Sequence, residues 1–467
     1  MKKPIVLLLS LFLTLIMQAQ NRPQPKSGPT PTINLKKPET FVLSNGLQVL
    51  VVEDHKLPRV SFNLTIDNAP YLEGNKKGVS SLTGRLLGKG TLSIPKEAFL
   101  EEVDFLGADL HFHSTGASGN ALSKYSGRIL ELLADGVLNP DFSQIELDKE
   151  KEKFIENLRA DEKNVPATAE RVENILAFGK NHPFGEYVSE TSLNNISLDD
   201  VKAIYNTYFV PENAYLVIVG DINFEQVKEK VEDLFGSWTK ASAPEFSYSD
   251  PKNVQYLQIN FVDMPNAVQS EIALVNSINL KMTDPDFFPA IVTNQILGGD
   301  FNSYLNMNLR EANGWTYGAR SNIGYGKFID KFIASASVRN AVTDSATVEF
   351  IKEIKRIRTE KVAADKLQDI KAGYIGRFVM NIEKPQTIAR YALNIKIENL
   401  PGNFYENFIK SINAVTPDDI LRVANKYFMI DNMRIIITGK ADEVVPGLKK
   451  LNIPIFYFDR FGNQIGN

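Results

Sequence analysis

The sequence contains no cysteine among its 467 residues. Disulfide bonds, thiolate nucleophiles and cysteine-ligated zinc or iron–sulfur sites are therefore excluded. Histidine is also scarce, because the chain carries only four, namely His55, His111, His113 and His182. Metal sites and catalytic triads that depend on imidazole consequently have few residues from which to form.

The sequence also lacks a strongly basic segment and, beyond its N-terminus, a long apolar run. Lys and Arg number 52 against 56 Asp and Glu, a net charge of −4, so we do not expect nucleic acid as a partner. No later segment reaches about 18 consecutive apolar residues, so we expect no membrane span in the mature chain. With 43% hydrophobic and 23% charged residues, the composition is typical of a folded protein with two or more domains.

The N-terminus has the pattern of an export signal. Two lysines precede an apolar run over residues 5–17, and residues 17–19 offer the small or polar side chains suited to cleavage. Such a run is too short to cross a bilayer of about 30 Å as a stable helix. We therefore predict a signal peptide over residues 1–19, a proline-rich lead-in over residues 20–36, and an exported protein in the periplasm or the extracellular space.

One segment of the chain occurs twice. Residues 197–220 align without gaps with residues 416–439, at an offset of 219. Both copies follow the pattern of a capped amphipathic helix and a β-branched strand that ends at glycine. Eight positions are identical, namely Asp199/Asp418, Asp200/Asp419, Asn206/Asn425, Tyr208/Tyr427, Phe209/Phe428, Asn213/Asn432, Ile218/Ile437 and Gly220/Gly439. We interpret this as an internal duplication, because a common helix–strand pattern alone does not fix identical polar positions.

The duplication predicts an α+β fold with two homologous lobes. We place these lobes at residues 37–236 and 254–467, joined by a polar, proline-containing linker over residues 237–253. Each lobe begins with strands, and Asn45-Gly46 is a hairpin signal in the first. Long amphipathic helices follow the strands. This order favours antiparallel sheets that are covered by helices.

Three further stretches resemble the pitrilysin/insulinase family of inverted-motif zinc peptidases. They are residues 78–91 (GVSSLTGRLLGKGT), 132–142 (LLADGVLNPDF) and 297–317 (LGGDFNSYLNMNLREANGWTY). The resemblance covers nearly the whole mature chain. It implies a pair of related α+β lobes that form one half of a clam-shell peptidase, which encloses an extended peptide.

The zinc helix of that family carries H-x-x-E-H, a spacing that places two imidazoles on one helix face with a general base between them. In this sequence Ser81, Gly84 and Arg85 occupy the three positions. The third ligand of the family, a downstream glutamate, falls on Asn157, although a shift of one residue would place Glu156 there. Glycine cannot accept a proton and arginine stays cationic, so we predict no metal and no general base on this chain.

Two interpretations of the degenerate zinc positions remain open. Ser81 and Arg85 are ordinary surface groups of a helix, or Arg85 forms an ion pair with Glu150. The resemblance places Glu150 at an acid that supports the zinc ligands in the family.

The second lobe keeps a different pair of residues. We expect a helix up to Asn313, a left-handed cap at Gly314 and a strand from Trp315, which places Arg310 in a last helical turn and Tyr317 on the strand. Members of the family keep Arg and Tyr at these positions, where they hydrogen-bond the substrate near the scissile carbonyl. Donors of this kind contribute about 2.7 to 4 kcal/mol each to hydrolysis. The alternative is an arginine that neutralises a helix terminus and a tyrosine in a half-buried strand.

Glycines and histidines supply the remaining candidates. Gly298-Gly299 is a plain helix cap or, as the resemblance implies, a flexible turn that faces the chamber. His111 and His113 lie on one face of a predicted strand and could bind a metal, but no third ligand is identifiable. The resemblance matches this strand to the edge strand that receives the peptide by strand addition. His55 and His182 are explained by ordinary polar contacts.

The pattern of lost ligands and a kept Arg/Tyr pair gives our functional hypothesis. The chain is predicted to be the zinc-less, substrate-binding subunit of an exported heterodimeric metallopeptidase, whose homologous partner supplies zinc and general base. The mitochondrial processing peptidase and two-chain bacterial members of the family resemble this arrangement. A second hypothesis is an inactive peptide-binding or scaffold protein, like relatives in respiratory complexes. A third is a self-sufficient enzyme that uses Glu156 and the histidine pair.

Overall fold

The computed structural model of the chain describes residue 33 and residues 37–466, and Leu35–Asn467 form one compact unit. The predicted signal peptide lies outside the described residues, as does the predicted lead-in apart from Ile33. Residues 237–253, where we place the linker, contain no helix or strand.

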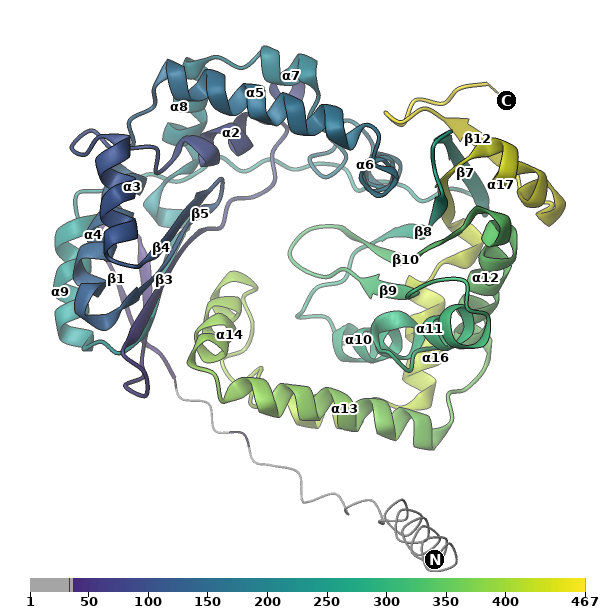
Figure 1. The fold of residues 1–467 in the computed structure, drawn as a ribbon. Helices are drawn as coiled ribbons and strands as arrows, with labels where there is room; N and C mark the ends of the chain where they lie inside the picture. Colours follow the sequence, from purple (N-terminus) through teal and green to yellow (C-terminus); the bar gives the residue numbers. More distant parts are fainter. Residues whose placement is uncertain (1–32, 34–36, 467) are drawn as a thin grey trace, which may run out of the picture. The chain divides into compact units, whose positions relative to one another are not determined.

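The described strands form two six-stranded sheets, one in each half of the chain (Figure 1). In the first sheet the strand order is β1-β2-β6-β3-β5-β4, and in the second it is β12-β7-β11-β8-β10-β9. The strands are β1 (Glu39–Val42), β2 (Gln48–Glu53), β3 (Arg59–Ile66), β4 (Asp109–His113), β5 (Gly116–Leu122), β6 (Ala214–Gly220), β7 (Gln258–Asp263), β8 (Gln269–Ile278), β9 (Arg320–Ile323), β10 (Asp330–Arg339), β11 (Arg434–Gly439) and β12 (Ile455–Phe458).

Helices surround both sheets, which agrees with the predicted α+β class. Within residues 37–466, no helix has both the length and the apolar composition that a membrane span requires. The helices are α2 (Val79–Leu86), α3 (Lys96–Phe105), α4 (Ser126–Leu138), α5 (Gln144–Asp161), α6 (Val165–Phe178), α7 (Glu190–Asn194), α8 (Leu198–Tyr208), α9 (Phe224–Phe235), α10 (Phe287–Asn294), α11 (Tyr304–Asn306), α12 (Thr343–Thr359), α13 (Ala364–Ile382), α14 (Pro385–Ile397), α15 (Phe408–Ala414), α16 (Pro417–Tyr427) and α17 (Ala441–Leu448).

Most neighbouring strands in each sheet are antiparallel, as predicted, and each sheet also contains parallel strand pairs. Strand β6 lies between β2 and β3, and it is parallel to β2 but antiparallel to β3. Strand β11 lies in the same way between β7 and β8. A strand inserted between two oppositely directed neighbours must be parallel to one of them. The chain returns to the middle of each sheet through helices, and the hairpin patterns of the sequence do not encode that return.

The duplicated segment forms the same unit in both halves. The side chains of Ser197 and Asp200 make a capping box at the start of α8, and those of Thr416 and Asp419 make one at the start of α16. Each helix leads into the central strand of its sheet, β6 or β11. The two strand orders are equivalent, except that the C-terminal strand β12 takes the edge position that β1 takes in the first sheet.

The predicted Asn45-Gly46 hairpin is present between β1 and β2. Gly46 has a φ of +103°, a conformation that side chains rarely adopt. The buried Asn45 amide donates hydrogen bonds to the carbonyls of Phe235 (2.8 Å) and Trp238 (3.1 Å). The turn is therefore tied to the end of α9.

Two equivalent helices are exchanged between the lobes. A shift of 219 carries residues 165–178, helix α6, onto residues 384–397, which contain α14. Helix α6 packs on the second sheet through Val172 and Phe178, whereas α14 packs on the first sheet through Ala389 and Leu393. The apolar side chains that α14 covers belong to β2 and β6, whose other face lies in the main core of the first lobe. Each sheet is therefore buried partly by a helix from the other half of the chain.

Replacement of Leu393 by alanine tests this exchange. The side chain is 8% exposed and contacts the first sheet, so its truncation is expected to cost about 2 to 5 kcal/mol locally. Hydrogen–deuterium exchange should then accelerate in β2 and β6, about 170 to 340 residues earlier in the sequence. The control is Met380→Ala on α13, a side chain that is 65% exposed. Unchanged protection of β2 and β6 in Leu393→Ala would contradict the exchange.

Candidate functional site

Helix α2 carries the degenerate zinc motif. Its N-terminus follows Gly78, which has a φ of +109°. Leu82 and Leu86 are buried against α5 and α8 together with Leu147 and Val201. These contacts fix one face of α2 in the core and leave the opposite face to display Ser81 and Arg85.

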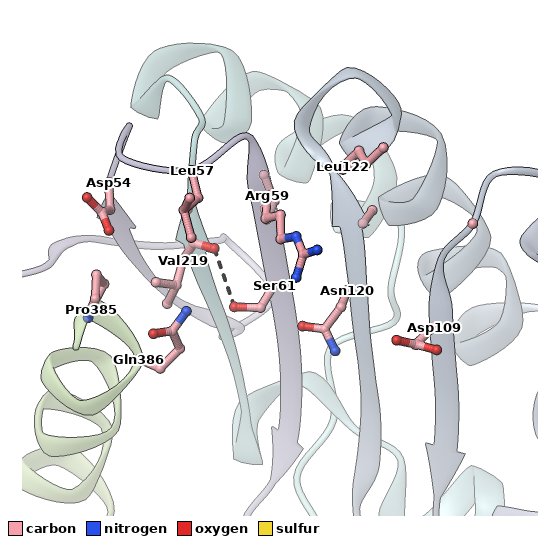
Figure 2. Close-up of a pocket in the computed structure, with 14 residues that line it drawn as sticks. Asp54, Leu57, Arg59, Ser61, Asp109, Asn120, Leu122, Val219, Pro385 and Gln386 are labelled. Carbon is pink, nitrogen blue, oxygen red and sulfur yellow. Dashed lines mark hydrogen bonds between the residues drawn. The ribbon is translucent and has the colours of Figure 1, made fainter. Parts of the chain in front are cut away.

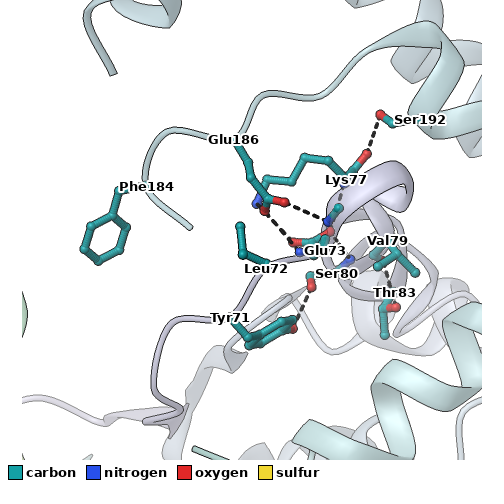
Figure 3. Close-up of polar contacts among 12 residues, drawn as sticks. Tyr71, Leu72, Glu73, Lys77, Val79, Ser80, Thr83, Phe184, Glu186 and Ser192 are labelled. Carbon is teal, nitrogen blue, oxygen red and sulfur yellow. Dashed lines mark hydrogen bonds and ion pairs between the residues drawn. The ribbon is translucent and has the colours of Figure 1, made fainter. Parts of the chain in front are cut away.

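A carboxylate network holds the start of α2 (Figure 3). One oxygen of Glu73 accepts hydrogen bonds from the backbone N–H groups of Gly78 (2.8 Å) and Ser80 (3.3 Å). Lys77 pairs with Glu73 at 3.2 Å and with Glu186 at 3.4 Å. A negative charge at a helix N-terminus satisfies free N–H groups and complements the helix dipole. The network therefore fixes the start of the helix that carries Ser81, Gly84 and Arg85.

The position of the family's general base is filled by backbone. A Cβ atom on Gly84 would lie 2.3 Å from the nitrogen of Ser114 and 2.6 Å from the carbonyl carbon of His113. Non-bonded atoms do not approach so closely. The turn between β4 and β5 thus occupies the space in which a glutamate side chain would begin, so the site lacks both the carboxylate and the room for it.

Arg85 does form an ion pair with Glu150, so of the two open interpretations the structure supports this one. The Nη1–Oε2 distance is 3.7 Å, and Glu150 is 5% exposed. Lys89 and Lys153 also pair with Glu150, at 3.2 and 3.5 Å. The guanidinium of Arg85 lies 4.5 Å from the ring centroid of Phe154. Three cations therefore surround one carboxylate beside the degenerate motif, and a dication there would be repelled.

The remaining ligand positions do not gather into a metal site. Ser81, Glu156 and Asn157 are all exposed. Among residues 37–466, no three His, Asp or Glu side chains come together as a group that could hold a metal ion. The residues present thus do not fit the zinc ion that the family resemblance implies.

The two histidines of β4 lie on its exposed face, and β4 is the edge strand of the first sheet. The Nδ1 atom of His113 lies 3.1 Å from the hydroxyl of Thr115, and burial lowers the pKa of the His113 imidazole. On the other face, the ring of Phe112 fits between two glycines: a Cβ on Gly88 or Gly136 would come within 2.3 or 2.4 Å of ring carbons. This insertion anchors the edge strand to the helices beneath it.

Arg310 lies in a π-helical segment, η5 (Met307–Ala312), which ends in the predicted left-handed cap. Gly314 has a φ of +63°, and its N–H donates to the carbonyl of Arg310 at 3.0 Å. The expected strand from Trp315 is wrong, because β9 begins at Arg320 and Tyr317 lies in the preceding loop. There the N–H of Gly318 donates to the Thr316 hydroxyl, and that of Ala319 to the side chain of Asn306, instead of to a neighbouring strand.

The functional ends of the Arg310 and Tyr317 side chains are accessible. Tyr317 is 93% exposed, in contrast to the half-buried strand position of the alternative interpretation. The guanidinium of Arg310 stacks 4.8 Å from the ring centroid of Phe301, and its Nε atom lies 3.3 Å from a carboxylate oxygen of Glu311. Arg310 is partly exposed, and within the described residues no hydrogen bond joins it to Tyr317.

Gly298 permits a close approach of two backbones. It belongs to a second π-helical segment, η4 (Gln295–Gly299), and a Cβ on it would lie 2.2 Å from the nitrogen of Ser321 in β9. Gly299 is exposed beside it. Gly298 is therefore neither a plain cap nor a free turn. Such π-helical segments often accompany functional sites, and this pair flanks the segment that leads to Arg310. Sequence periodicity did not reveal either of them.

A cavity of about 590 Å³ that sequence reasoning did not find opens on the first sheet beside the N-terminus of α14 (Figure 2). Arg59, Asn120 and Asp109 reach it from the neighbouring strands β3, β5 and β4, and Gln386 faces them from α14. These residues are far apart in the sequence and share no motif. The cavity adjoins the start of the edge strand, so it extends the polar surface of the candidate site.

Comparison with known proteins finds relatives that match most of the chain. An uncharacterized zinc protease of Rickettsia bellii is 24% identical over 411 residues, which cover 83% of this chain and 94% of that protein. A protein described as a non-peptidase homolog, YmxG of Helicobacter pylori, is 22% identical over 383 residues, 80% of this chain and 87% of its own length. Relatives at similar identity are thus described either as a zinc protease or as a non-peptidase.

Two solved structures share the fold. The peptidase M16 inactive domain from Pseudomonas fluorescens superimposes with a TM-score of 0.77 at 22% identity, covering 86% of this chain and 98% of its own. The first half of the periplasmic protease PqqL from Escherichia coli gives 0.70 at 15% identity, covering 93% and 99%.

Two family models match consecutive parts of the chain. The model of the insulinase family, peptidase family M16, matches residues 48–184. The model of the peptidase M16 inactive domain matches residues 195–374. The first match contains the helix with Ser81, Gly84 and Arg85, and the second contains Arg310 and Tyr317. The chain belongs to the insulinase family of peptidases, family M16, with Ser81, Gly84 and Arg85 at the positions of the family's zinc motif.

Proposed function

We propose that this chain is the substrate-binding subunit of an exported two-chain metallopeptidase. A homologous partner supplies the zinc ion and the general base, and this chain contributes Arg310, Tyr317 and part of the peptide-binding surface. The observation that carries the proposal is the contrast between the two sites. The degenerate zinc site is filled by backbone and cations, whereas in the second lobe Tyr317 is exposed and Arg310 is partly exposed.

The chemistry of the exposed pair supports a role in cleavage. A guanidinium and a phenol both donate hydrogen bonds, and a peptide carbonyl oxygen gains negative charge as its carbon is attacked. The ring of Phe301 and the carboxylate of Glu311 orient the Arg310 guanidinium without burying it. The loop position of Tyr317 leaves its hydroxyl free to approach a peptide that is bound elsewhere in the assembly.

The edge strand supports peptide binding. One edge of β4 has no neighbouring strand in the first sheet, and Phe112 holds β4 in place from below. An extended peptide can pair with such an edge through backbone hydrogen bonds. The polar cavity at the start of β4 provides room for side chains of the same peptide.

Export is part of the proposal because of the N-terminal sequence. The lysine pair and apolar run of residues 1–19 are typical of a signal peptide. The structural relative PqqL, which is described as periplasmic, is consistent with that location.

A second candidate function is a peptide-binding or scaffold protein that takes part in no cleavage. The specific observation in its favour is the similarity to the non-peptidase homolog of Helicobacter pylori. The two candidates differ in one outcome, because only the first requires a zinc-bearing partner whose activity depends on Arg310 and Tyr317.

The Arg310→Ala/Tyr317→Phe double variant tests the leading proposal. Loss of both donors should lower the kcat/KM of the reconstituted pair for a fluorogenic peptide by about 100-fold or more, because transition-state charge loses its stabilisation. Size-exclusion chromatography should find assembly unchanged.

The matched control is Arg339→Ala/Tyr256→Phe, which alters an exposed arginine and a half-exposed tyrosine away from this pair. Its kcat/KM is expected to stay within about twofold of wild type. If the Arg310/Tyr317 variant cleaved peptide as fast as this control, the proposed contribution to catalysis would be wrong.

Restoring the zinc motif tests the absence of metal chemistry on this chain. The Ser81→His/Gly84→Glu/Arg85→His variant should bind no stoichiometric zinc, because the turn at Ser114 excludes the new glutamate side chain. Its thermal unfolding temperature should fall by several degrees. Elemental analysis after dialysis measures the zinc, and Ser81→His alone, at an exposed site, is the control for stability. Tight zinc at one ion per chain in the triple variant would contradict the filled site.

A further inference from the structure

A second cavity of about 520 Å³ lies where the two exchanged helices end. Asn174 and Phe178 line it from the last turns of α6, and Ile397 and Glu398 line it from the end of α14. The C-terminal end of a helix carries a partial negative charge, equivalent to about half an elementary charge. Two helices that end at one cavity therefore favour a cation there.

Aromatic rings form much of the wall. Phe178 and Phe184 pack edge to face with ring centroids 5.5 Å apart. Phe184, Tyr325 and Phe328 are 36%, 46% and 41% exposed, so their rings remain available to a ligand. The Nζ atom of Lys331 already lies 5.7 Å from the centroid of the Phe178 ring. Ring faces of this kind attract ammonium and guanidinium groups.

The charged side chains around the cavity do not balance. Three carboxylates line it, from Asp67, Asp330 and Glu398, together with the ammonium groups of Lys327 and Lys331. Lys327 pairs with Asp67, and Lys331 pairs at 2.6 Å with the buried Glu173 of α6. Three carboxylates therefore line the cavity together with two ammonium groups, and each ammonium group already has a partner.

These pairings leave two of the lining carboxylates, Asp330 and Glu398, without an ion pair. Asp330 accepts a hydrogen bond from the backbone N–H of Lys331 at 2.7 Å, so Glu398 is the less satisfied of the two. Glu398 follows the last residue of α14, where the helix dipole disfavours a negative charge, and it is partly buried. Within the described residues it makes no hydrogen bond or ion pair with another side chain. Burial raises the pKa of Glu398, and the neighbouring Asp67 raises it further, whereas Lys327 lowers it. A bound cation would supply the compensation that the chain itself does not.

We propose that this cavity binds the guanidinium group of an arginine side chain in an extended peptide. The guanidinium pairs with Glu398 and stacks against the rings of Phe328 and Tyr325. Arginine fits better than lysine, because a planar guanidinium can both stack on an aromatic face and donate two parallel hydrogen bonds to one carboxylate. The inference rests on the peptide-binding part of the proposed function and names the residue that the bound peptide carries.

Direct binding to the purified full-length mature chain tests the inference without any cleavage. The probes are a short fluorescent peptide with one arginine and no other charge, and the same peptide with citrulline or lysine in that place. Citrulline keeps the shape of arginine but carries no charge. We expect the arginine peptide to bind about 10-fold more tightly than the citrulline peptide, a preference that weakens as salt is added. Equal affinities of these two peptides, or a lysine peptide that binds at least as tightly, would overturn the assignment.

The Glu398→Gln variant tests whether Glu398 causes the preference for arginine over citrulline. In this variant the affinities of the arginine and citrulline peptides should differ by no more than about twofold, while the citrulline peptide binds as before. The matched control is Glu383→Gln, an exposed glutamate that follows α13 in the same way as Glu398 follows α14. If the preference for arginine persisted in Glu398→Gln, or were lost equally in Glu383→Gln, the arginine side chain would not bind at Glu398.

The Lys327→Met variant provides a test of opposite sign, which misfolding cannot imitate. It removes the ammonium group that competes for the carboxylates, so the arginine peptide should bind about threefold more tightly. Weaker binding would contradict the inference.

The results of these binding experiments can be distinguished from the result of the cleavage experiment that tests the proposed function. An arginine preference in the lone chain, combined with no cleavage by the reconstituted pair, would remove the catalytic role and retain this site. Cleavage that depends on Arg310 and Tyr317 but is indifferent to arginine would do the reverse.

Discussion

The exchange of α6 and α14 between the lobes is the constraint on which the rest of the structure depends. Each helix buries apolar side chains of the sheet that belongs to the other half, and the cost of exposing those strand faces joins the halves into one compact unit. The same exchange brings two helix C-termini to one cavity and the N-terminus of α14 to another. Both cavities are consequences of packing that no local segment specifies.

The packing at the degenerate zinc site leaves no room for a side chain at position 84. The turn between β4 and β5 lies against the helix at a distance that any Cβ would prevent. The cations that surround Glu150 reinforce this arrangement, because they satisfy a carboxylate that would otherwise be buried alone. The helix is retained as a structural element, and its N-terminus is still held by Glu73. The family fold thus persists without the family chemistry on this chain.

Local sequence patterns were sufficient for the elements whose causes are local. The capping boxes at Ser197 and Thr416, the turn at Gly46 and the cap at Gly314 all depend on residues within a few positions of one another. The expected strand from Trp315 failed for a tertiary reason, since the side chain of Asn306 takes the backbone group of Ala319 that a strand would have used. The parallel strand pairs within these sheets were not predicted, because β6 and β11 return to the sheet centres about 90 residues after the preceding strands.

The sequence by itself determined that no cysteine is available as a metal ligand and that Ser81, Gly84 and Arg85 stand at the family's zinc positions. It also determined the duplication and hence the two lobes. Only the tertiary structure decided that Arg85 pairs with Glu150 and that Gly84 has no room for a side chain. It also decided that Glu398 lines one cavity with aromatic residues of the first half of the chain. The physical reason is the distance along the chain over which each kind of interaction acts. Helix spacing and turn geometry act over a few residues, whereas burial, charge compensation and cavities depend on which distant segments pack together.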